Sequence, residues 1–121
     1  MANPSDVPAS SAGTEILRRV HGNPTSSSGL VVLNGVANYT YTILSVTVCE
    51  TAGTAETFNM ILGADGQTTN VFIIKAQSLP ANGTFVFSDK FVMSETDELV
   101  FSLGDSGNVD VLVSYIENRW A

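Results

Sequence analysis

The sequence contains one histidine, His21, and one cysteine, Cys49, and these side chains are the best suited to nucleophilic chemistry. A catalytic thiol or hydroxyl needs a base that the scaffold holds within hydrogen-bond reach. His21 precedes a Gly-Asn-Pro sequence, which predicts an irregular, flexible loop. Cys49 lies in an apolar run beside a valine, which predicts a buried or half-buried structural thiol. The sequence therefore predicts no nucleophilic site, and a single cysteine cannot form an internal disulfide.

Two acidic segments are the remaining candidates for acid–base chemistry or metal binding. Residues 94–98 (SETDE) carry carboxylates, but an acid–base pair needs one carboxyl with a raised pKa, and carboxylates grouped in a turn are normally solvated. Residues 105–110 (DSGNVD) carry several oxygen-bearing side chains, but calcium binds about six to eight oxygens, and Glu117 lies at the wrong offset for an EF-hand loop. One cysteine and one histidine cannot complete a zinc site. We therefore expect no enzyme activity, no metal and no other cofactor.

The chain has a net charge of −7 at neutral pH, and the distribution of this charge excludes several partners. The charges of residues 1–21 sum to zero, whereas the rest of the chain carries ten acidic residues against Lys75, Lys90 and Arg119. Nucleic-acid binding requires a basic surface, so we expect no nucleic-acid partner. No apolar run approaches the roughly 20 residues that span a bilayer, and residues 1–13 lack the features of a signal peptide. We expect no membrane partner, and synthesis in a cytoplasm.

The positions of the apolar residues predict an all-β fold. From residue 29 onward, short apolar runs alternate with turns at intervals of about 8–12 residues, a pattern typical of a sandwich or barrel. In the last run, Val109 and Val111 share one face of a strand, while Asp110 lies on the other. We therefore predict a single antiparallel β-sandwich, jelly-roll-like or Ig-like, over residues 29–121. The expected strands are 29–34, 39–49, 56–62, 69–77, 84–92, 97–103 and 108–116.

Two of the expected strands depart from simple alternation. Adjacent apolar residues at 43–44 shift the phase of their strand, which predicts a β-bulge. The segment VFII at 71–74 is apolar on both faces, so we expect Phe72 and Ile74 to meet either a neighbouring subunit or the N-terminal segment. We expect Trp120 to dock on the body or on a neighbouring subunit. Together these residues favour self-association as a dimer or trimer.

Residues 1–28 differ in composition from the rest and predict an extended N-terminal arm. Residues 1–13 contain proline, glycine and serine and are too polar to form a core alone. One apolar segment, TEILRRV at 14–20, follows before a second loop. This segment either orders on a capsid surface or a sister subunit, with its arginines pairing to acidic groups, or forms an edge strand of the sandwich itself. The residues expected to make the intermolecular contacts are Ile16, Leu17, Arg18, Arg19 and Val20.

Three segments of the expected sandwich, between Tyr41 and Ile116, share a strand-and-turn pattern with a known family. They contain ILSVTVCETAGTAETFNMIL, TTNVFIIKAQSLPANGTFVFSDKFVMSETDELVFSL and NVDVLVSYI. This pattern resembles that of small β-sandwich virion proteins of tailed bacteriophages, of the head decoration or cement type. The resemblance implies a virion component, which either decorates or cements the capsid or lies in the tail and fibre apparatus. The expected N-terminal arm favours the first role, a structural protein on the capsid surface that stabilises the capsid by bridging major capsid proteins. Its implied partners are the major capsid protein and further copies of itself.

An alternative function is a tail or fibre module that binds a host-surface glycan. Tyr39, Tyr41, Asn82 and Trp120 would form its aromatic and polar platform, although the two tyrosines would equally suit cross-strand packing.

Overall fold

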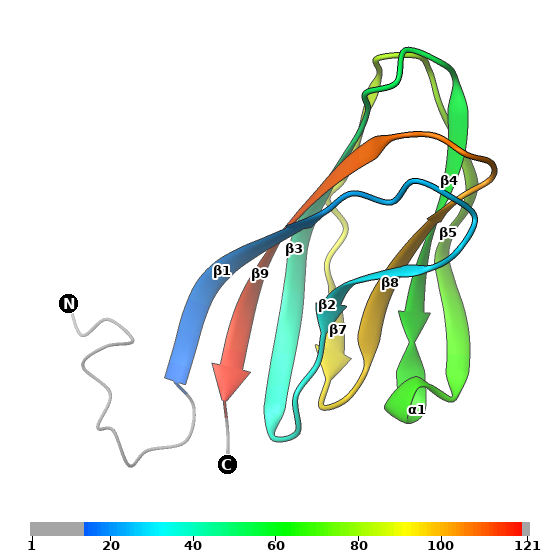
Figure 1. Cartoon of the computed structure of the whole chain (residues 1–121). Helices are drawn as coiled ribbons and strands as arrows, with labels where there is room; N and C mark the ends of the chain where they lie inside the picture. Colours follow the sequence, from blue (N-terminus) through cyan, green and yellow to red (C-terminus); the bar gives the residue numbers. More distant parts are fainter. Residues whose placement is uncertain (1–13, 120–121) are drawn as a thin grey trace.

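The computed structural model describes residues 14–119, which form nine β-strands and one helical turn (Figure 1). The predicted all-β sandwich is confirmed. Within the described residues no helix is long and apolar enough to cross a membrane. The strands are β1 (Thr14–Gly22), β2 (Leu30–Asn34), β3 (Tyr39–Glu50), β4 (Glu56–Gly63), β5 (Thr69–Leu79), β6 (Thr84–Phe87), β7 (Phe91–Ser94), β8 (Glu98–Leu103) and β9 (Val109–Arg119), and the helical turn is α1 (Ala64–Gln67).

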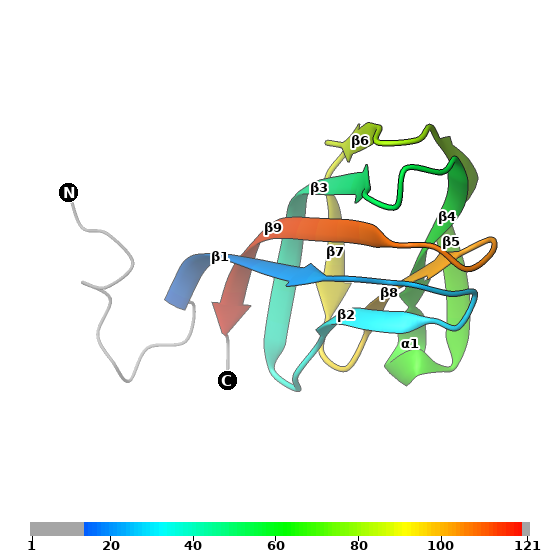
Figure 2. The ribbon, with the colours of Figure 1, turned by 45° about the horizontal axis from the view of Figure 1, so that its top comes forward.

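The strands form two antiparallel sheets that face each other (Figures 1 and 2). The five-stranded sheet has the order β1-β9-β3-β6, with β7 also paired to β3, and the four-stranded sheet has the order β2-β8-β4-β5. If β6 and β7 count as one interrupted strand, the pairs are nested: β1 with β9, β2 with β8, β3 with β6 and β7, and β4 with β5. Nested pairing of this kind is the double Greek key of a jelly roll, one of the two topologies that the sequence left open.

The predicted strand at 84–92 is wrong in one respect, because Ser88, Asp89 and Lys90 interrupt it. β6 pairs with the second half of β3 up to Val46↔Phe87, and β7 pairs with its first half from Ile43↔Phe91. The register of β3 against β9 shifts between Ile43 and Ser45, which confirms the predicted bulge. A bulge bends its strand and disrupts the local ladder. The interruption in the neighbouring strand lies opposite this bend, so one irregularity accounts for the other.

The described part of the expected N-terminal arm belongs to the sandwich. β1 pairs with β9 without interruption from Thr14↔Arg119 to Gly22↔Val111, so residues 14–20 are an edge strand. His21, expected in a loop, lies in this strand. The loop after β1 is also fixed, because its Pro24, Thr25 and Ser26 carbonyls accept backbone hydrogen bonds from residues 103–109. The remainder of the expected arm, residues 1–13, lies outside the described residues.

The core lies between the two sheets and contains the alternate side chains of the central strands. Ile43, Val46 and Val48 of β3 are fully buried, as are Phe58 and Met60 of β4. The rings of Phe58 and Phe85 of β6 pack edge to face at a centroid distance of 5.6 Å, and this contact joins the two sheets. Burial of a side chain of this size contributes about 1.5–3 kcal/mol. The core also contains Val32, Leu33, Tyr41, Leu79, Met93, Leu99, Phe101, Leu103, Val109, Val111, Val113 and Tyr115.

Glu50, at the end of β3, is the one charged side chain among the buried described residues, and its exposed fraction is 1%. Its carboxylate accepts backbone N–H hydrogen bonds from Ala52 at 2.7 Å, Gly53 at 2.9 Å and Asn82 at 2.9 Å. It therefore joins the β3–β4 loop to the β5–β6 turn. Donation from the Asn82 N–H, and then from the β3–β4 loop, lowers the pKa of Glu50 below its ordinary value.

We predict that Glu50→Gln destabilises the fold at neutral pH and flattens its dependence on pH. The folded pKa of Glu50 is lowered, so its stabilisation is complete above the unfolded pKa and is lost as the pH falls through the folded pKa. Urea unfolding at several pH values below about 5 would measure this loss, which the variant should lack. Asp89→Asn, in the exposed β6–β7 loop, is the matched control. Parallel stability profiles for Glu50→Gln and the wild type would contradict the assignment.

Candidate interaction surfaces

An open groove between the outer face of the five-stranded sheet and the start of β2 collects the residues with nucleophilic or acid–base chemistry. His21, Asn23, Cys49 and Asp110 line this groove. His21 lies on β1 and Cys49 on β3, and β9 separates the two strands, so their backbones are about 10 Å apart. The Asn23 amide donates to Asp110 Oδ1 at 3.1 Å and to the Val109 carbonyl at 2.8 Å. The polar groups of the groove therefore hold the β1–β2 loop against β9. Among the described residues, no hydrogen bond joins the His21 imidazole to the Cys49 thiol.

The two acidic segments form turns that satisfy their own backbone. Asp97 Oδ2 accepts a hydrogen bond from the Ser94 N–H at 3.2 Å, and Asp105 Oδ1 accepts one from the Ser106 N–H at 2.8 Å. The segment at 104–108 links β8 in one sheet to β9 in the other. No group of three potential metal-ligating side chains occurs in the part of the chain that the structure describes.

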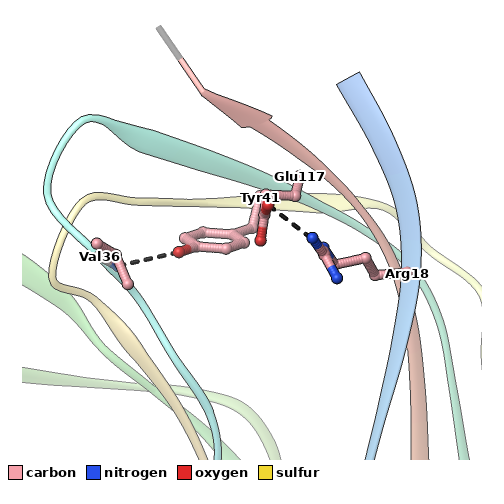
Figure 3. Close-up of polar contacts among 4 residues, drawn as sticks. All are labelled: Arg18, Val36, Tyr41 and Glu117. Atoms are coloured by element: carbon pink, nitrogen blue, oxygen red, sulfur yellow. Dashed lines mark hydrogen bonds and ion pairs between the residues drawn. The ribbon is translucent and has the colours of Figure 1, made fainter. Parts of the chain in front are cut away.

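The aromatic platform considered for a glycan is not assembled by the described residues. Tyr41 is 2% exposed, and its hydroxyl accepts a hydrogen bond from the Val36 N–H at 3.0 Å (Figure 3). It stacks on Tyr39 with a centroid distance of 6.1 Å, and burial raises the pKa of the Tyr41 phenol. Asn82 binds Glu50 at the far end of β3. Tyr41 is therefore a core residue, and Trp120 lies outside the described residues.

The residues expected to make contacts from the N-terminal segment divide between the two faces of β1. Leu17, with an exposed fraction of 72%, and Arg19 share the outer face, since their partners on β9 are the outward Ile116 and Ser114. Ile16, Arg18 and Val20 lie on the inner face. The Arg18 guanidinium Nε donates to Glu117 Oε2 at 3.3 Å (Figure 3). Arg18 thus pairs with an acidic group of its own chain, whereas the sequence predicted arginine pairs with another molecule. Leu17 and Arg19 are left exposed on this edge.

Four apolar side chains form a row across the outer face of the four-stranded sheet, and we call them the apolar row. Val31 of β2, Val100 of β8, Ile61 of β4 and Phe72 of β5 are successive Cα partners. Val31 is 41% exposed and Phe72 is 46% exposed, while the two central residues are half-buried. A Cβ atom at Gly29 would lie 2.8 Å from Val100 Cγ1, so a larger residue at position 29 would collide with this member of the row.

Phe72 and Ile74, which the sequence analysis grouped together, have different positions. Phe72 belongs to the apolar row, and the Lys75 ammonium lies 5.3 Å from the centre of its ring. Ile74 pairs with the buried Met60 and packs against the core. The other three members of the apolar row could not be grouped with Phe72 from the sequence, because each lies in a different segment. The sequence carried one signal for this row. Val100 is apolar although it alternates with the buried residues of its strand and therefore points outward.

The chain matches no protein-family model and no curated protein. Solved structures share its fold. A subunit of the Bacillus endospore appendages, described as disulfide-linked pili, has a TM-score of 0.54 and 13% identity over 93% of this chain and 95% of that chain. A chain of the infectious bursal disease virus particle has a TM-score of 0.52 and 9% identity over 91% of this chain, which spans 36% of the viral one. The Gx strain of this virus gives a TM-score of 0.50 and 10% identity over 91% of this chain and 38% of that chain.

We predict that the apolar row contributes little to folding. Phe72→Ala should lower the free energy of unfolding by about 1 kcal/mol or less, because the ring is half exposed. Phe101→Ala, its matched control in the core, should cost about 3–5 kcal/mol. Chemical denaturation of both variants measures the difference. Equal losses would mean that Phe72 is a structural residue.

Proposed function

We propose that this protein is a structural virion protein that decorates a phage capsid and stabilises it by bridging adjacent major capsid proteins. The observation that carries this proposal is the apolar row, an apolar strip that crosses all strands of one sheet of an acidic domain and that no described residue covers completely. Exposed apolar surface that folding does not need favours a binding role. In this proposal the chain is made in the host cytoplasm and acts on the capsid surface.

The physical basis of the proposed stabilisation is apolar burial repeated over many copies. Each square ångström of apolar surface removed from water contributes about 25 cal/mol, so a strip of four side chains supports only a weak contact per copy. A copy that touches two capsid subunits gains from the high effective concentration of the second site. Lys75 beside Phe72 also provides a positive charge at the rim of the strip, on a protein that is otherwise acidic.

The similar solved structures support a role in a repetitive assembly. The endospore appendage is a pilus and the other structure is a virus particle, and both are assemblies of this kind. Disulfide links along a filament need at least two cysteines per subunit, whereas the sequence has Cys49 alone. The proposed capsid contact therefore relies on noncovalent burial. The glycan-binding alternative has no assembled aromatic platform among the described residues to favour it.

Binding of purified protein to undecorated capsids would test the proposed contact. We expect Phe72→Lys and Val31→Lys each to weaken binding at least about tenfold, because a charge in the strip must be desolvated at the contact. Val86→Lys is the control, since Val86 is a 59% exposed valine of the other sheet. Capsid binding unchanged by both strip variants would show that the strip is not the contact.

Quantitative mass spectrometry of purified phage particles would test whether the protein lies on the capsid or in the tail. Hundreds of copies per particle are expected for a capsid decoration protein. A handful of copies would indicate the tail, and absence from the particle would exclude a virion role.

A further inference from the structure

We propose that two copies of this protein pair through β1, antiparallel, about a two-fold axis that passes between the two Leu17 residues. The five-stranded sheets of the two copies would then join into one continuous sheet. This inference goes beyond the proposed capsid role, because it concerns the protein alone. It also uses another part of the surface, the β1 edge of the five-stranded sheet, whereas the apolar row lies on the face of the four-stranded sheet.

β1 differs from the other sheet edges in its length and regularity. It runs for nine residues, pairs only with β9 among the described strands and shows no shift of register. β2 has five residues and a register shift between Val31 and Leu33. β5 has two shifts against β4 and a left-handed residue, Ala76, at φ 52. β6 and β7 have four residues each. Short, bulged or broken edges resist strand addition, whereas a long regular edge offers a row of unpaired N–H and C=O groups.

The side chains of β1 select one register for pairing with a second copy. A two-fold axis perpendicular to the sheet places the outer faces of both copies on the same side of the joined sheet. Each outward side chain of β1 therefore lies opposite an outward side chain of the second copy. With the axis at Leu17, Glu15 lies opposite Arg19 of the second copy on both sides of the axis, and the two exposed leucines meet. An axis at Arg18 would place the two Arg18 residues opposite each other, and an axis at Ile16 would leave Arg19 without an acidic partner. Opposite charges that face each other across strands are favourable, and like charges are not.

The other charges on β1 do not oppose this pairing. Arg18, on the inner face, already binds Glu117 of its own chain. In the proposed register it faces Ile16 of the second copy, whose apolar side chain can pack on the arginine stem. Because the irregular edges fit β1 poorly, β1 fits best against another β1. This contact is isologous and closes as a dimer, whereas a head-to-tail contact would continue into a filament.

Sedimentation equilibrium of the full 121-residue chain, without capsids, tests the dimer. We expect a dimer for the wild type and for the control Val86→Asp, and a monomer for Leu17→Asp, which places two carboxylates at the axis. Glu15→Arg alone and Arg19→Glu alone should each raise the dimer dissociation constant about tenfold, since each creates two like-charge pairs. The double variant Glu15→Arg/Arg19→Glu should return the dissociation constant to the wild-type value, because it restores both opposite-charge pairs. Circular dichroism would confirm that each variant is folded.

A disulfide between copies provides a second test that does not depend on stability. In a Cys49→Ser background, Leu17→Cys should give an oxidised dimer on a non-reducing gel, because directly opposed residues are within disulfide range. Arg19→Cys in the same background should not, since the two copies of residue 19 lie on opposite sides of the axis. A monomeric wild type, no rescue by the double charge variant, or equal crosslinking at both positions would overturn the proposal. Capsid binding by the Leu17→Asp monomer separates this result from the proposed function.

Discussion

Each strand of a sandwich can bury only one of its two faces against the opposite sheet, and much of this molecule follows from that constraint. Alternate side chains of β3, β4, β8 and β9 fill the interior, so the fold makes little demand on the residues between them. On the outer face of β3 these residues include Thr42, Ser45 and Thr47, whereas Val, Ile and Phe occupy the apolar row. Apolar residues at positions that folding leaves free are better explained by contact with another molecule.

The ends of the sandwich are held by polar groups, which gives the outer surfaces a rigid support. The Glu50 carboxylate joins two connections at one place, and the Asn23 amide holds the β1–β2 loop to the start of β9. The Asn23 amide binds the carbonyl of the buried Val109, and backbone N–H groups of the two connections satisfy the buried Glu50 carboxylate. A surface fixed in this way loses little conformational entropy when it binds. Weak contacts through the apolar row or through β1 are therefore favoured by the scaffold on which they lie.

Period-two alternation was sufficient to predict most strands and the bulge near Leu44, because both are local properties of the sequence. The choice between jelly roll and Ig-like topology depends on which distant strands pair, and alternation carries no information about that. The place of His21 was misjudged because the following Gly-Asn-Pro suggests a loop, while the pairing partner that orders it, Leu112, is far away in the sequence. Phe72 was identified from its own segment, but its neighbours in the apolar row became visible only through the register of four strands.

The nesting of the strand pairs also sets the order in which the chain can fold. Thr14 and Arg119 are Cα partners, so the first and last described strands close the sheet together. β4 and β5, joined through α1, can pair as soon as both are synthesised, whereas β1 has no partner until β9 has left the ribosome. Contacts between residues so distant in sequence slow folding. β1 therefore remains without this partner until β9 has been synthesised, and a molecular chaperone that shields β1 would protect the nascent chain from aggregation until then.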